Sequence, residues 1–316
     1  MVLKHLVYLA ALARERHFGR AAEACHVSQA TLSEAIRRLE GELGVPLVQR
    51  GHRFQGLTPE GERALAWAHR ILADADGMRG DLTAMREGVG GSLRLGAIPT
   101  SLPFVSRLTA PLRERHPAVR MTIRSLSSRE IERDLHEGAL DAALTYLENE
   151  PLRGVRRQPL YDERYLFVAP RASRWAAGAS VRWREAAGAP LCLLSRDMQN
   201  RRIVDALFAR AGATPDPAVE TNSISTLHAQ VRDAGLCAVM ADTWLSGFGV
   251  PAGMVALPLT EPSAAQAVGL VWRDRDPEPA LVRALIATAR DVAALSRRSR
   301  TSSAPAARSP ARSRGA

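Results

Sequence analysis

Apolar positions in the first sixty residues follow the three- and four-residue spacing of amphipathic helices. The stretch 3–13 predicts a first helix, and Phe18 to Arg50 predicts two short helices joined by a tight turn at 25–27. Ser28 stands where the N-cap of the second of these helices belongs. This pattern predicts a helix-turn-helix, although a helical hairpin with a solvated basic face would show the same spacing. The apolar stripe of the second helix comprises Leu32, Ile36, Leu39 and Leu43.

A strand entry at 45–48 and a basic turn at 50–53 follow, and a long helix then runs from Pro59 to about Glu87. Thr58 is a suitable N-cap for it, and proline suits the first helical position. Its apolar seam is too long for one small domain to bury, so we expect a linker helix that pairs with a second copy. A core helix packed on its own chain is the alternative. The seam comprises Leu65, Ala68, Leu72, Ala75, Met78, Leu82 and Met85.

The pattern changes after the glycine-rich break at Gly88–Ser92. Apolar runs typical of buried strands alternate with helical patterns from residue 93 onward, and a second such series begins near Tyr165. A last helix is expected from Pro279 to Leu295. Strand–helix–strand repetition at this spacing predicts βαβ units and a mostly parallel sheet, which is an α/β domain.

Composition narrows the class of protein. Of the 316 residues, 46% are hydrophobic, and no stretch approaches the roughly 18 uninterrupted apolar residues of a membrane span. The apolar N-terminus continues directly into the helix-turn-helix pattern, so we interpret it as a helix and expect a cytoplasmic protein. Much of the net charge of +10 comes from six arginines in the tail 297–316, which has no acidic residue and which we expect to be disordered.

Catalytic chemistry finds no support in the sequence. It has no glycine-rich phosphate loop followed by lysine, no histidine and cysteine spacing for a metal, and no nucleophile elbow. We therefore expect that the protein is not an enzyme and that it binds neither a cofactor nor a metal. The three cysteines, Cys25, Cys192 and Cys237, are best interpreted as small buried residues, with a redox pair of Cys192 and Cys237 as the alternative.

The run AAEACHVSQATLSEAIRRLEGELGVPLVQR, followed by LTPEG, resembles the winged helix-turn-helix of LysR-type transcriptional regulators from about Leu3 to Ala64. The resemblance implies an all-α-type winged helix-turn-helix with a long linker helix, then a two-lobe α/β effector domain similar to periplasmic binding proteins. It also implies a homodimer through the linker, a homotetramer, and contact with RNA polymerase. The segment RFQGLTPEGERALAWAHRILAD resembles the corresponding segment of regulators encoded near formate dehydrogenase operons.

The expected division of the chain follows from this resemblance. The DNA-binding domain is expected at 1–58, the linker helix at 59–88, and the effector domain at 92–296, ahead of the basic tail. Within the effector domain, lobe I is expected to comprise 92–161 and 268–296, and lobe II to comprise 162–267.

The candidate DNA-reading residues lie on the second helix and in the wing. The amide of Gln29 suits adenine, whereas Arg37 and Arg38 are better placed for phosphates. The family commonly has proline at the position of Ala30 and arginine at that of Glu34, so the base preference is not predicted. Glu34 would repel phosphate unless it accepts from cytosine or pairs with Arg38. The full set is Ser28, Gln29, Ala30, Thr31, Ser33, Glu34, Arg37, Arg38, Arg50, His52 and Arg53.

Candidate effector contacts lie where strands end and helices begin, because free backbone N–H groups there attract anions. In the family that the chain resembles, the loop at Thr100 contacts the inducer. Several of these residues could instead serve only as N-caps. The set is rich in hydroxyls and amides and poor in acids, so we expect a small anion or carboxylate, with a large apolar inducer as the alternative. The set is Thr100, Ser101, Ser127, Ser128, Gln199, Asn200, Asn222, Ser223 and Thr243.

Taken together, the sequence predicts a regulator that binds double-stranded promoter DNA and responds to a small-molecule effector bound between two lobes. The alternative is a cytoplasmic small-molecule sensor whose basic head only tethers it to DNA without sequence specificity. A shift titration against the promoter next to its own gene would separate the two.

Overall fold

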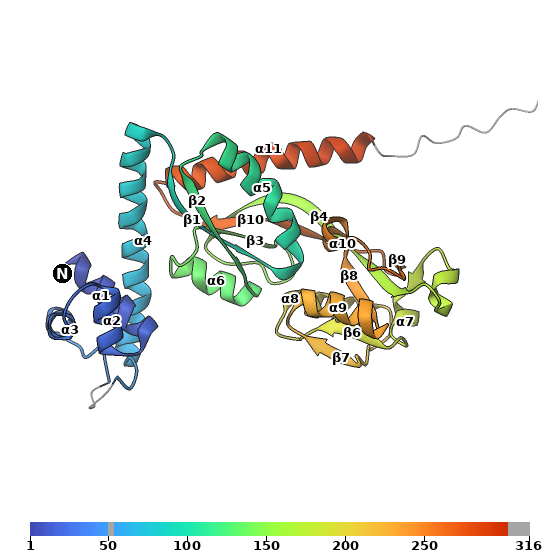
Figure 1. The fold of residues 1–316 in the computed structure, drawn as a ribbon, viewed down its shortest axis with the longest axis horizontal. Coiled ribbons are helices and arrows are strands. Elements are labelled where there is room, and N and C mark those ends of the chain that lie inside the picture. Colours follow the sequence, from blue (N-terminus) through green and yellow to red (C-terminus); the bar gives the residue numbers. More distant parts are fainter. Residues whose placement is uncertain (50–53, 303–316) are drawn as a thin grey trace, which may run out of the picture.

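The computed structural model describes residues 1–49 and 54–302, with the side chains of 296–302 left out. A small helical head lies at one end of a long helix, and two α/β lobes lie beside that helix and beyond it (Figure 1). The predicted wing residues Arg50, His52 and Arg53 lie outside the described residues. The final helix runs on to Ser302, past the predicted end at Leu295, so residues 297–302 continue a helix.

Three short helices and the start of a long one make up the head. They are α1 (Leu3–Glu15), α2 (Phe18–Ala24), α3 (Gln29–Leu43) and α4 (Pro59–Glu87). The side chains of His17, Ser28 and Thr58 accept backbone N–H groups at the starts of α2, α3 and α4. Gly44, with φ of 71°, ends α3 in the left-handed region. These capping residues set the ends of the helices, and the observed helices form the predicted helix-turn-helix.

The two halves of the long helix α4 differ in how their apolar residues are covered. Its first half packs into the head, where Ala68 is buried and Leu65 and Leu72 lie against the same core. Farther along, Met78, Leu82 and Met85 are exposed. The single pairing seam predicted for this helix is therefore wrong in its first half, because spacing alone does not say which neighbour covers an apolar residue.

Lobe I is a sheet with helices on both faces. Its strands β1 and β3 run parallel to the edge strand β2, and β10 runs antiparallel to β3. Leucines of β1 and β3 pack against α5 and α11 in one continuous core. The elements are β1 (Gly91–Ala97), η1 (Pro99–Ser101), α5 (Leu102–Arg115), β2 (Val119–Ser125), α6 (Ser128–His136), β3 (Ala142–Tyr146), β10 (Ala265–Arg273) and α11 (Ala280–Ser302).

Lobe II is a second α/β layer, in which β6 pairs in parallel with β7 and β8. Its helices α8 and α9 cover opposite sides of these strands, as their places in two separate apolar clusters indicate. The elements are η2 (Arg174–Ala177), β5 (Val181–Arg182), α7 (Trp183–Ala186), β6 (Leu191–Leu194), α8 (Gln199–Arg210), β7 (Val219–Thr221), α9 (Ile224–Ala234), β8 (Cys237–Ala241), α10 (Asp242–Phe248) and β9 (Met254–Thr260).

One strand belongs to both lobes. β4 (Val155–Pro170) pairs with β10 up to Arg164 and with β8 and β9 from Tyr165 onward. Figure 1 shows it passing from one lobe into the other. Because a single strand spans the crossing, the residues at its middle lie at the hinge between the lobes.

Candidate DNA interface and ligand cavity

The outward face of α3 presents most of the predicted DNA-reading residues. Gln29, Ala30, Glu34, Arg37 and Arg38 are exposed, and Ser33 and Thr31 lie on the same helix, half-buried and exposed respectively. The Ser28 hydroxyl accepts the N–H of Thr31 at 3.1 Å and lies 2.8 Å from its Oγ1. Ser28 therefore holds the helix start, which favours the capping interpretation for that residue.

Glu34 neutralises part of the basic character of this face. Its carboxylate lies 3.2 Å from Arg38 Nε and 3.5 Å from Arg37 Nη1. The i,i+4 pair with Arg38 was one of the two possibilities that the sequence left for Glu34. Because both arginines are partly offset, the face offers phosphates less positive charge than its arginine count suggests.

The base of the wing is tied to α3 by one carboxylate. Glu40 Oε1 accepts the N–H groups of Leu47 at 2.8 Å and Val48 at 3.2 Å. Val48 forms a bridge with Leu57, and Gln49 donates from Nε2 to the Leu57 carbonyl at 3.0 Å. The strand ends that lead into the wing are thus fixed relative to the recognition helix.

A small cavity lies between the lobes and is lined by residues at the starts of α6 and α8. Figure 1 shows these two helices next to each other, one in each lobe. The volume of the cavity is about 10 Å³, enough for roughly one water molecule. Five predicted effector residues line it, together with Tyr146 and Met198. The five are Thr100, Ser127, Ser128, Gln199 and Asn200.

The other four predicted effector residues lie outside this lining. Ser101 is buried, but its hydroxyl donates to the Ile98 carbonyl at 3.0 Å. Ser223 caps α9 by accepting the Thr226 N–H at 3.3 Å, and Asn222 beside it is exposed. Thr243 lines a separate groove between α5 and α10. These residues were predicted because each lies near the start of a helix. A residue at such a position can be either an N-cap or a ligand contact, and the sequence does not distinguish the two.

Two polar atoms of the cavity have no partner among the described residues. They are Ser128 Oγ and Gln199 Oε1, whose side chains are 4% and 3% exposed. A buried polar group without a hydrogen bond costs free energy, so these atoms are ready to bind a ligand or water. Ser127 differs, because its hydroxyl and N–H are both engaged with Glu130 in a capping box.

The backbone around the cavity favours negative charge. α6 and α8 both begin there, and α8 has no side-chain cap, so N–H groups of its first turn lack an intrahelical partner. Two helix starts that converge on one small space create a positive potential. The geometry therefore suits a small acceptor-rich ligand.

Tyr146 and Glu163 extend the site beyond what the sequence predicted. Tyr146 Oη donates to Glu163 Oε1 at 2.5 Å, lies 3.2 Å from Thr100 Oγ1, and accepts from Asn200 Nδ2 at 2.9 Å. Both residues are fully or almost fully buried. The alternation Tyr161, Glu163, Tyr165 along one strand face is the feature of the sequence that could have pointed to this carboxylate.

Polar contacts between α8 and residues 149–150 form a clasp that joins the lobes near the cavity, which Gln199 lines. Arg202 of α8 donates twice to Glu150 of lobe I, at 2.7 and 2.6 Å. Gln199 Nε2 donates to the carbonyl of Asn149, and Asn149 Nδ2 donates to Gln266. These contacts hold the lobes closed over the cavity.

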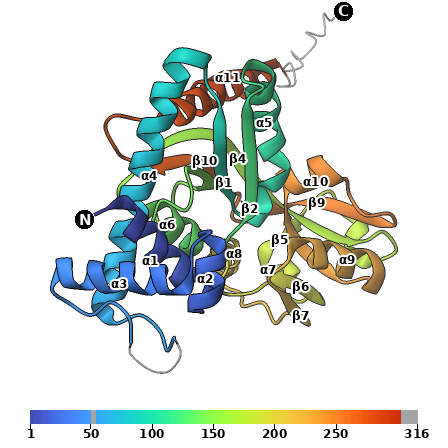
Figure 2. The same ribbon diagram turned by 60° about the vertical axis from the view of Figure 1, so that its left-hand side comes forward.

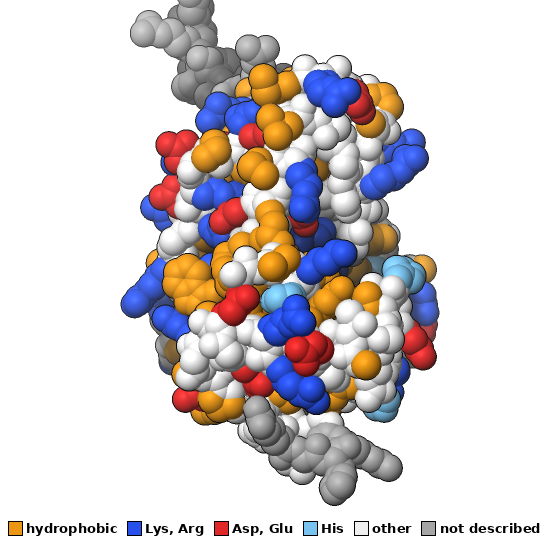
Figure 3. Space-filling model, turned by 90° about the vertical axis from the view of Figure 1, so that its left-hand side faces the viewer, with side chains coloured by type: hydrophobic (Ala, Val, Ile, Leu, Met, Phe, Trp, Pro, Cys, Tyr) orange, Lys and Arg blue, Asp and Glu red, His pale blue; other side chains and the backbone are white. Residues whose placement is uncertain are grey.

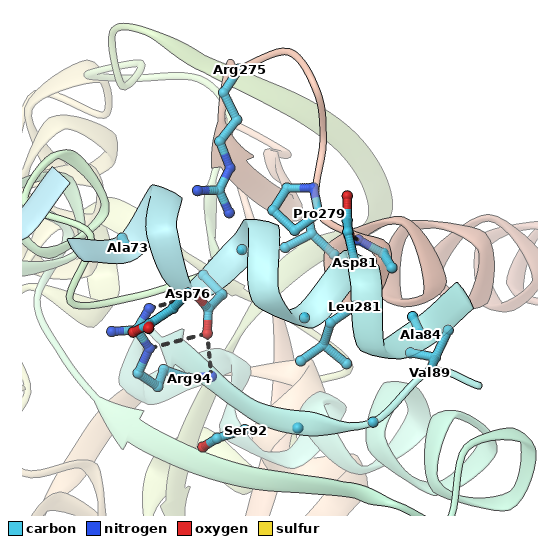
Figure 4. Close-up of a pocket in the computed structure, with 17 residues that line it drawn as sticks. Ala73, Asp76, Asp81, Ala84, Val89, Ser92, Arg94, Arg275, Pro279 and Leu281 are labelled. Atoms are coloured by element: carbon cyan, nitrogen blue, oxygen red, sulfur yellow. Dashed lines mark hydrogen bonds and ion pairs between the residues drawn. The ribbon is translucent and has the colours of Figure 1, made fainter. Parts of the chain in front are cut away.

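A second pocket of about 380 Å³ lies between α4, the start of β1 and the start of α11. Figure 4 shows Asp81 and Arg275 at its rim, with Pro279 and Leu281 beside the helix. Arg275 and Arg273 donate to Asp74, and Asp81 accepts the N–H of Ala280. This row of carboxylates fixes α4 against lobe I.

The thiols are poorly suited to redox or metal chemistry. Burial raises the pKa of Cys192 and of Cys237 to about 11, so both stay protonated at neutral pH. They lie on neighbouring strands but in different apolar clusters. Within 1–49 and 54–302 no group of three histidine, cysteine or acidic residues could hold a metal, and no helix is long and apolar enough to cross a membrane.

Known proteins match this chain along nearly its whole length. Residues 3–62 match the model of bacterial regulatory helix-turn-helix proteins of the lysR family, and residues 86–294 match the LysR substrate binding domain. The DNA-binding transcriptional dual regulator OxyR of Escherichia coli K12 is 32% identical over 283 residues, covering 88% of this chain and 91% of that protein.

Two further likenesses agree with these matches. A probable hydrogen peroxide-inducible genes activator of Mycobacterium xenopi is 41% identical over 162 residues, covering 51% of this chain and 85% of that protein. The structure of a full-length OxyR variant from Pseudomonas aeruginosa superimposes with a TM-score of 0.73 at 31% identity, covering 92% of this chain and 98% of that one. None of these three points to formate dehydrogenase operons, so that part of the resemblance finds no support.

Proposed function

Because this chain belongs to the LysR family of bacterial helix-turn-helix regulators, and is a DNA-binding transcriptional regulator with an effector-binding domain, we propose that its effector is a small anion or carboxylate bound between the lobes. The observation that carries this proposal is the buried hydroxyl of Ser128, which has no hydrogen-bond partner among the described residues and lies beside two helix starts. An anion would satisfy the hydroxyl and the free N–H groups together.

The test uses the substitution Ser128→Ala in the full-length protein. Because this hydroxyl makes no hydrogen bond in the structure described, its removal should leave folding intact. A hydrogen bond to a charged ligand contributes about 1.5–3 kcal/mol, so affinity should fall roughly 10- to 100-fold. Isothermal titration with a panel of small carboxylates and oxyanions measures this.

Ser101→Ala is the matched control, because Ser101 is a buried serine of the same lobe whose hydroxyl bonds to the Ile98 carbonyl and does not line the cavity. Equal affinity of the Ser128 variant and the wild type for every anion that binds would place the effector elsewhere.

We propose that α3 reads the operator with Gln29 on base edges and with Arg37 and Arg38 on phosphates. The exposure of all three side chains on α3 supports this. Arg50, His52 and Arg53 stay in the proposal as wing contacts. A shift titration on the promoter next to the gene should show that Gln29→Ala loses preference for the operator over unrelated DNA, whereas Arg37→Ala weakens binding to both.

Oxidation of a thiol is a second candidate signal, because related proteins are named hydrogen peroxide-inducible genes activators. The chemistry of the described thiols argues against it. A peroxide reacts with a thiolate, and burial keeps Cys192 and Cys237 protonated. Cys25 is only half-buried, yet burial raises its pKa as well. We therefore propose that this chain does not sense its signal through its cysteines.

We propose a homodimer through α4, supported by the exposed apolar side chains of Trp67, Met78, Leu82 and Met85. In Figure 3, which views the face that carries α4, hydrophobic side chains alternate with basic ones. A homotetramer, contact with RNA polymerase, a cytoplasmic location and the absence of enzymatic activity complete the proposal. So does the division into a DNA-binding domain at 1–58, a linker at 59–88 and an effector domain at 92–296.

A further inference from the structure

Glu163 is a carboxylate buried at the hinge with no basic partner among the described residues. It lies on β4 opposite Gln266 of β10, next to the point where β4 leaves lobe I. Its side chain is fully buried, and Oε2 has no hydrogen-bond partner in the part of the chain described. A buried carboxylate without a cation is costly, so its presence calls for a physical reason.

A short chain of hydrogen bonds links this carboxylate to the cavity. Glu163 Oε1 accepts from Tyr146 Oη, and Tyr146 in turn is bonded to Asn200 and lies beside Thr100. Tyr146, Asn200 and Thr100 all line the cavity. Glu163 is thus separated from a bound effector by one side chain, and its charge is felt in the cavity.

The groups that face Glu163 leave its charge finely balanced. Burial raises the pKa of Glu163 to about 7, against the hydroxyl groups of Tyr146, Thr100 and Tyr165, which lower it. Asp242 of α10 raises it further by like-charge repulsion. The other titratable neighbours are Tyr146 of β3 and Tyr161 and Tyr165 of β4, and burial raises the pKa of each, so all three stay neutral.

We propose that Glu163 takes up one proton when the lobes bind a small anion, so that anion and proton enter the site between the lobes as a neutral pair. The inference rests on the anion-binding function proposed above. The proton comes from solvent and forms an O–H bond at Glu163 Oε2, the oxygen without a partner among the described residues. Protonation removes the repulsion between two negative charges that share a poorly solvated space.

The sign of the pH dependence follows directly. An anion raises the proton affinity of Glu163, so binding is tightest where Glu163 is already protonated or is readily protonated. Above about pH 7 Glu163 is largely ionised before the anion binds, so binding requires uptake of a proton from solvent, and the proton concentration falls as the pH rises. Affinity should therefore fall by up to about tenfold per pH unit in that range.

The first experiment observes the carboxyl group itself. Infrared difference spectra of the full-length protein between about pH 6 and pH 8 should show loss of a protonated-carboxyl band, and Glu163→Gln should lack that change. Glu114→Gln is the matched control, since Glu114 is exposed on α5 of the same lobe. An identical difference spectrum for the wild type and the Glu163 variant would overturn the proposal.

The second experiment counts protons by titration calorimetry with acetate and with inorganic phosphate, in two buffers of different ionisation enthalpy. Wild-type protein should take up close to one proton per acetate at about pH 8, and Glu163→Gln should take up none. Tyr146→Phe removes the hydrogen bond that lowers the Glu163 pKa, so its uptake should persist to higher pH. A merely structural role for Tyr146 would not move the pH of the uptake.

The two experiments separate the failure of this inference from the failure of the function on which it rests. If acetate or phosphate binds without proton uptake, the proton linkage is wrong and the anion site stands. If neither anion binds to wild type at either pH, the proposed effector class is wrong, and with it the linkage to an anion.

Discussion

At the scale of the residue, the charge of the recognition face is set by Glu34 as much as by its arginines. One carboxylate engages both Arg37 and Arg38, and all three side chains are exposed. Exposed pairs contribute little to stability, so this arrangement acts mainly on what the face offers to DNA. Glu34 thus tunes how strongly the helix attracts any duplex.

Glu34→Gln should therefore release two arginines for phosphates. We expect binding to tighten on operator and unrelated DNA alike, and the slope of log K against log salt to steepen by about 1 for each additional phosphate that an arginine neutralises. Fluorescence anisotropy over a salt series measures both. Glu114→Gln makes the same change in net charge far from α3 and should leave the slope unchanged. A lower affinity for the operator would mean instead that Glu34 accepts from a cytosine.

Gly61 is a second residue at which a close neighbour matters, because the neighbouring backbone leaves no space for a side chain. A Cβ atom at this position would lie 2.0 Å from the Leu47 carbonyl oxygen, at the base of the wing. Gly61→Ala should destabilise the head by about 1–3 kcal/mol or more, because rigid backbone must shift. Gly80→Ala on the same helix meets no atom within 4 Å, and should stabilise it by up to about 1 kcal/mol. Thermal unfolding compares them, and equal melting temperatures would contradict this account.

Residue-scale prediction from the sequence worked where a rule is local. Ser28, Thr58, Ser127 and Ser223 cap the helices that they precede, as their positions indicate. The same rule could not separate Ser128, which faces the cavity with a free hydroxyl, from Ser223, which only caps. That distinction depends on which helix starts meet in space, and no local pattern carries it.

At the scale of the element, α4 is the most informative. Its small side chains at Ala73, Gly77, Gly80 and Ala84 line the pocket against lobe I, and its large apolar ones at Met78, Leu82 and Met85 face away. One helix therefore has a side of small residues toward lobe I and a side of large apolar residues that is uncovered in the single chain. Figure 2 shows α4 running alongside lobe I.

Leu82→Asp should break the assembly without harming the fold. Leu82 is 58% exposed in the single chain, so a charge there costs little until a second copy covers it. We expect sedimentation velocity to show a smaller species and operator affinity to fall, because two heads no longer bind together. Thr83→Asp places the same charge on an exposed residue beside the seam and should leave the assembly intact. An unchanged sedimentation coefficient for Leu82→Asp would move the interface away from α4.

Element order and type could largely be read from periodicity, since strand–helix alternation after Gly88 matches the observed order through β3, and β6, α8, α9 and β8 also appear as predicted. The short strand β7 between α8 and α9 was not predicted. The elements that pack against α4 could not be predicted from periodicity. Spacing marks Leu72 and Met78 alike as apolar seam, yet the head core takes the first and leaves the second exposed. Only the tertiary position of α1 against α4 decides between them.

At the scale of the whole molecule, the two lobes contact each other at two places. Arg202 of α8 pairs with Glu150, and α10 approaches α5 so closely that a Cβ at Gly247 would lie 2.7 Å from Pro103 Cβ. Movement of the lobes about β4 would change both contacts. The relative position of the lobes therefore depends on the clasp as well as on the hinge strand.

Glu150→Gln should loosen the clasp. The Arg202 hydrogen bond holds the pKa of Glu150 below its ordinary value, so the clasp is intact above that pKa and is lost as the pH falls through it. We expect faster release of a bound anion from the variant at neutral pH, and from wild type only in acid, as measured by stopped flow. Glu148→Gln, an exposed neighbour in the same loop, is the control. Equal release rates would show that the clasp does not limit opening.

The molecule-scale site was predicted in part. Helix starts from both lobes meet at one cavity, as the α/β pattern implies, and five of nine predicted residues line it. Tyr146 and Glu163 were not found, because their contact is made between β3 of lobe I and β4, the strand that passes from one lobe to the other. A buried carboxylate is visible only once its surroundings are known.

The closed cavity has a consequence for how quickly the protein can respond in time. With room for about one water molecule, it cannot admit a carboxylate or a larger effector unless the lobes move apart. Occupancy then changes at the rate of lobe opening and not at the rate of diffusion. A regulator built this way averages over brief fluctuations in concentration, and it retains a record of its signal for as long as one closed interval lasts.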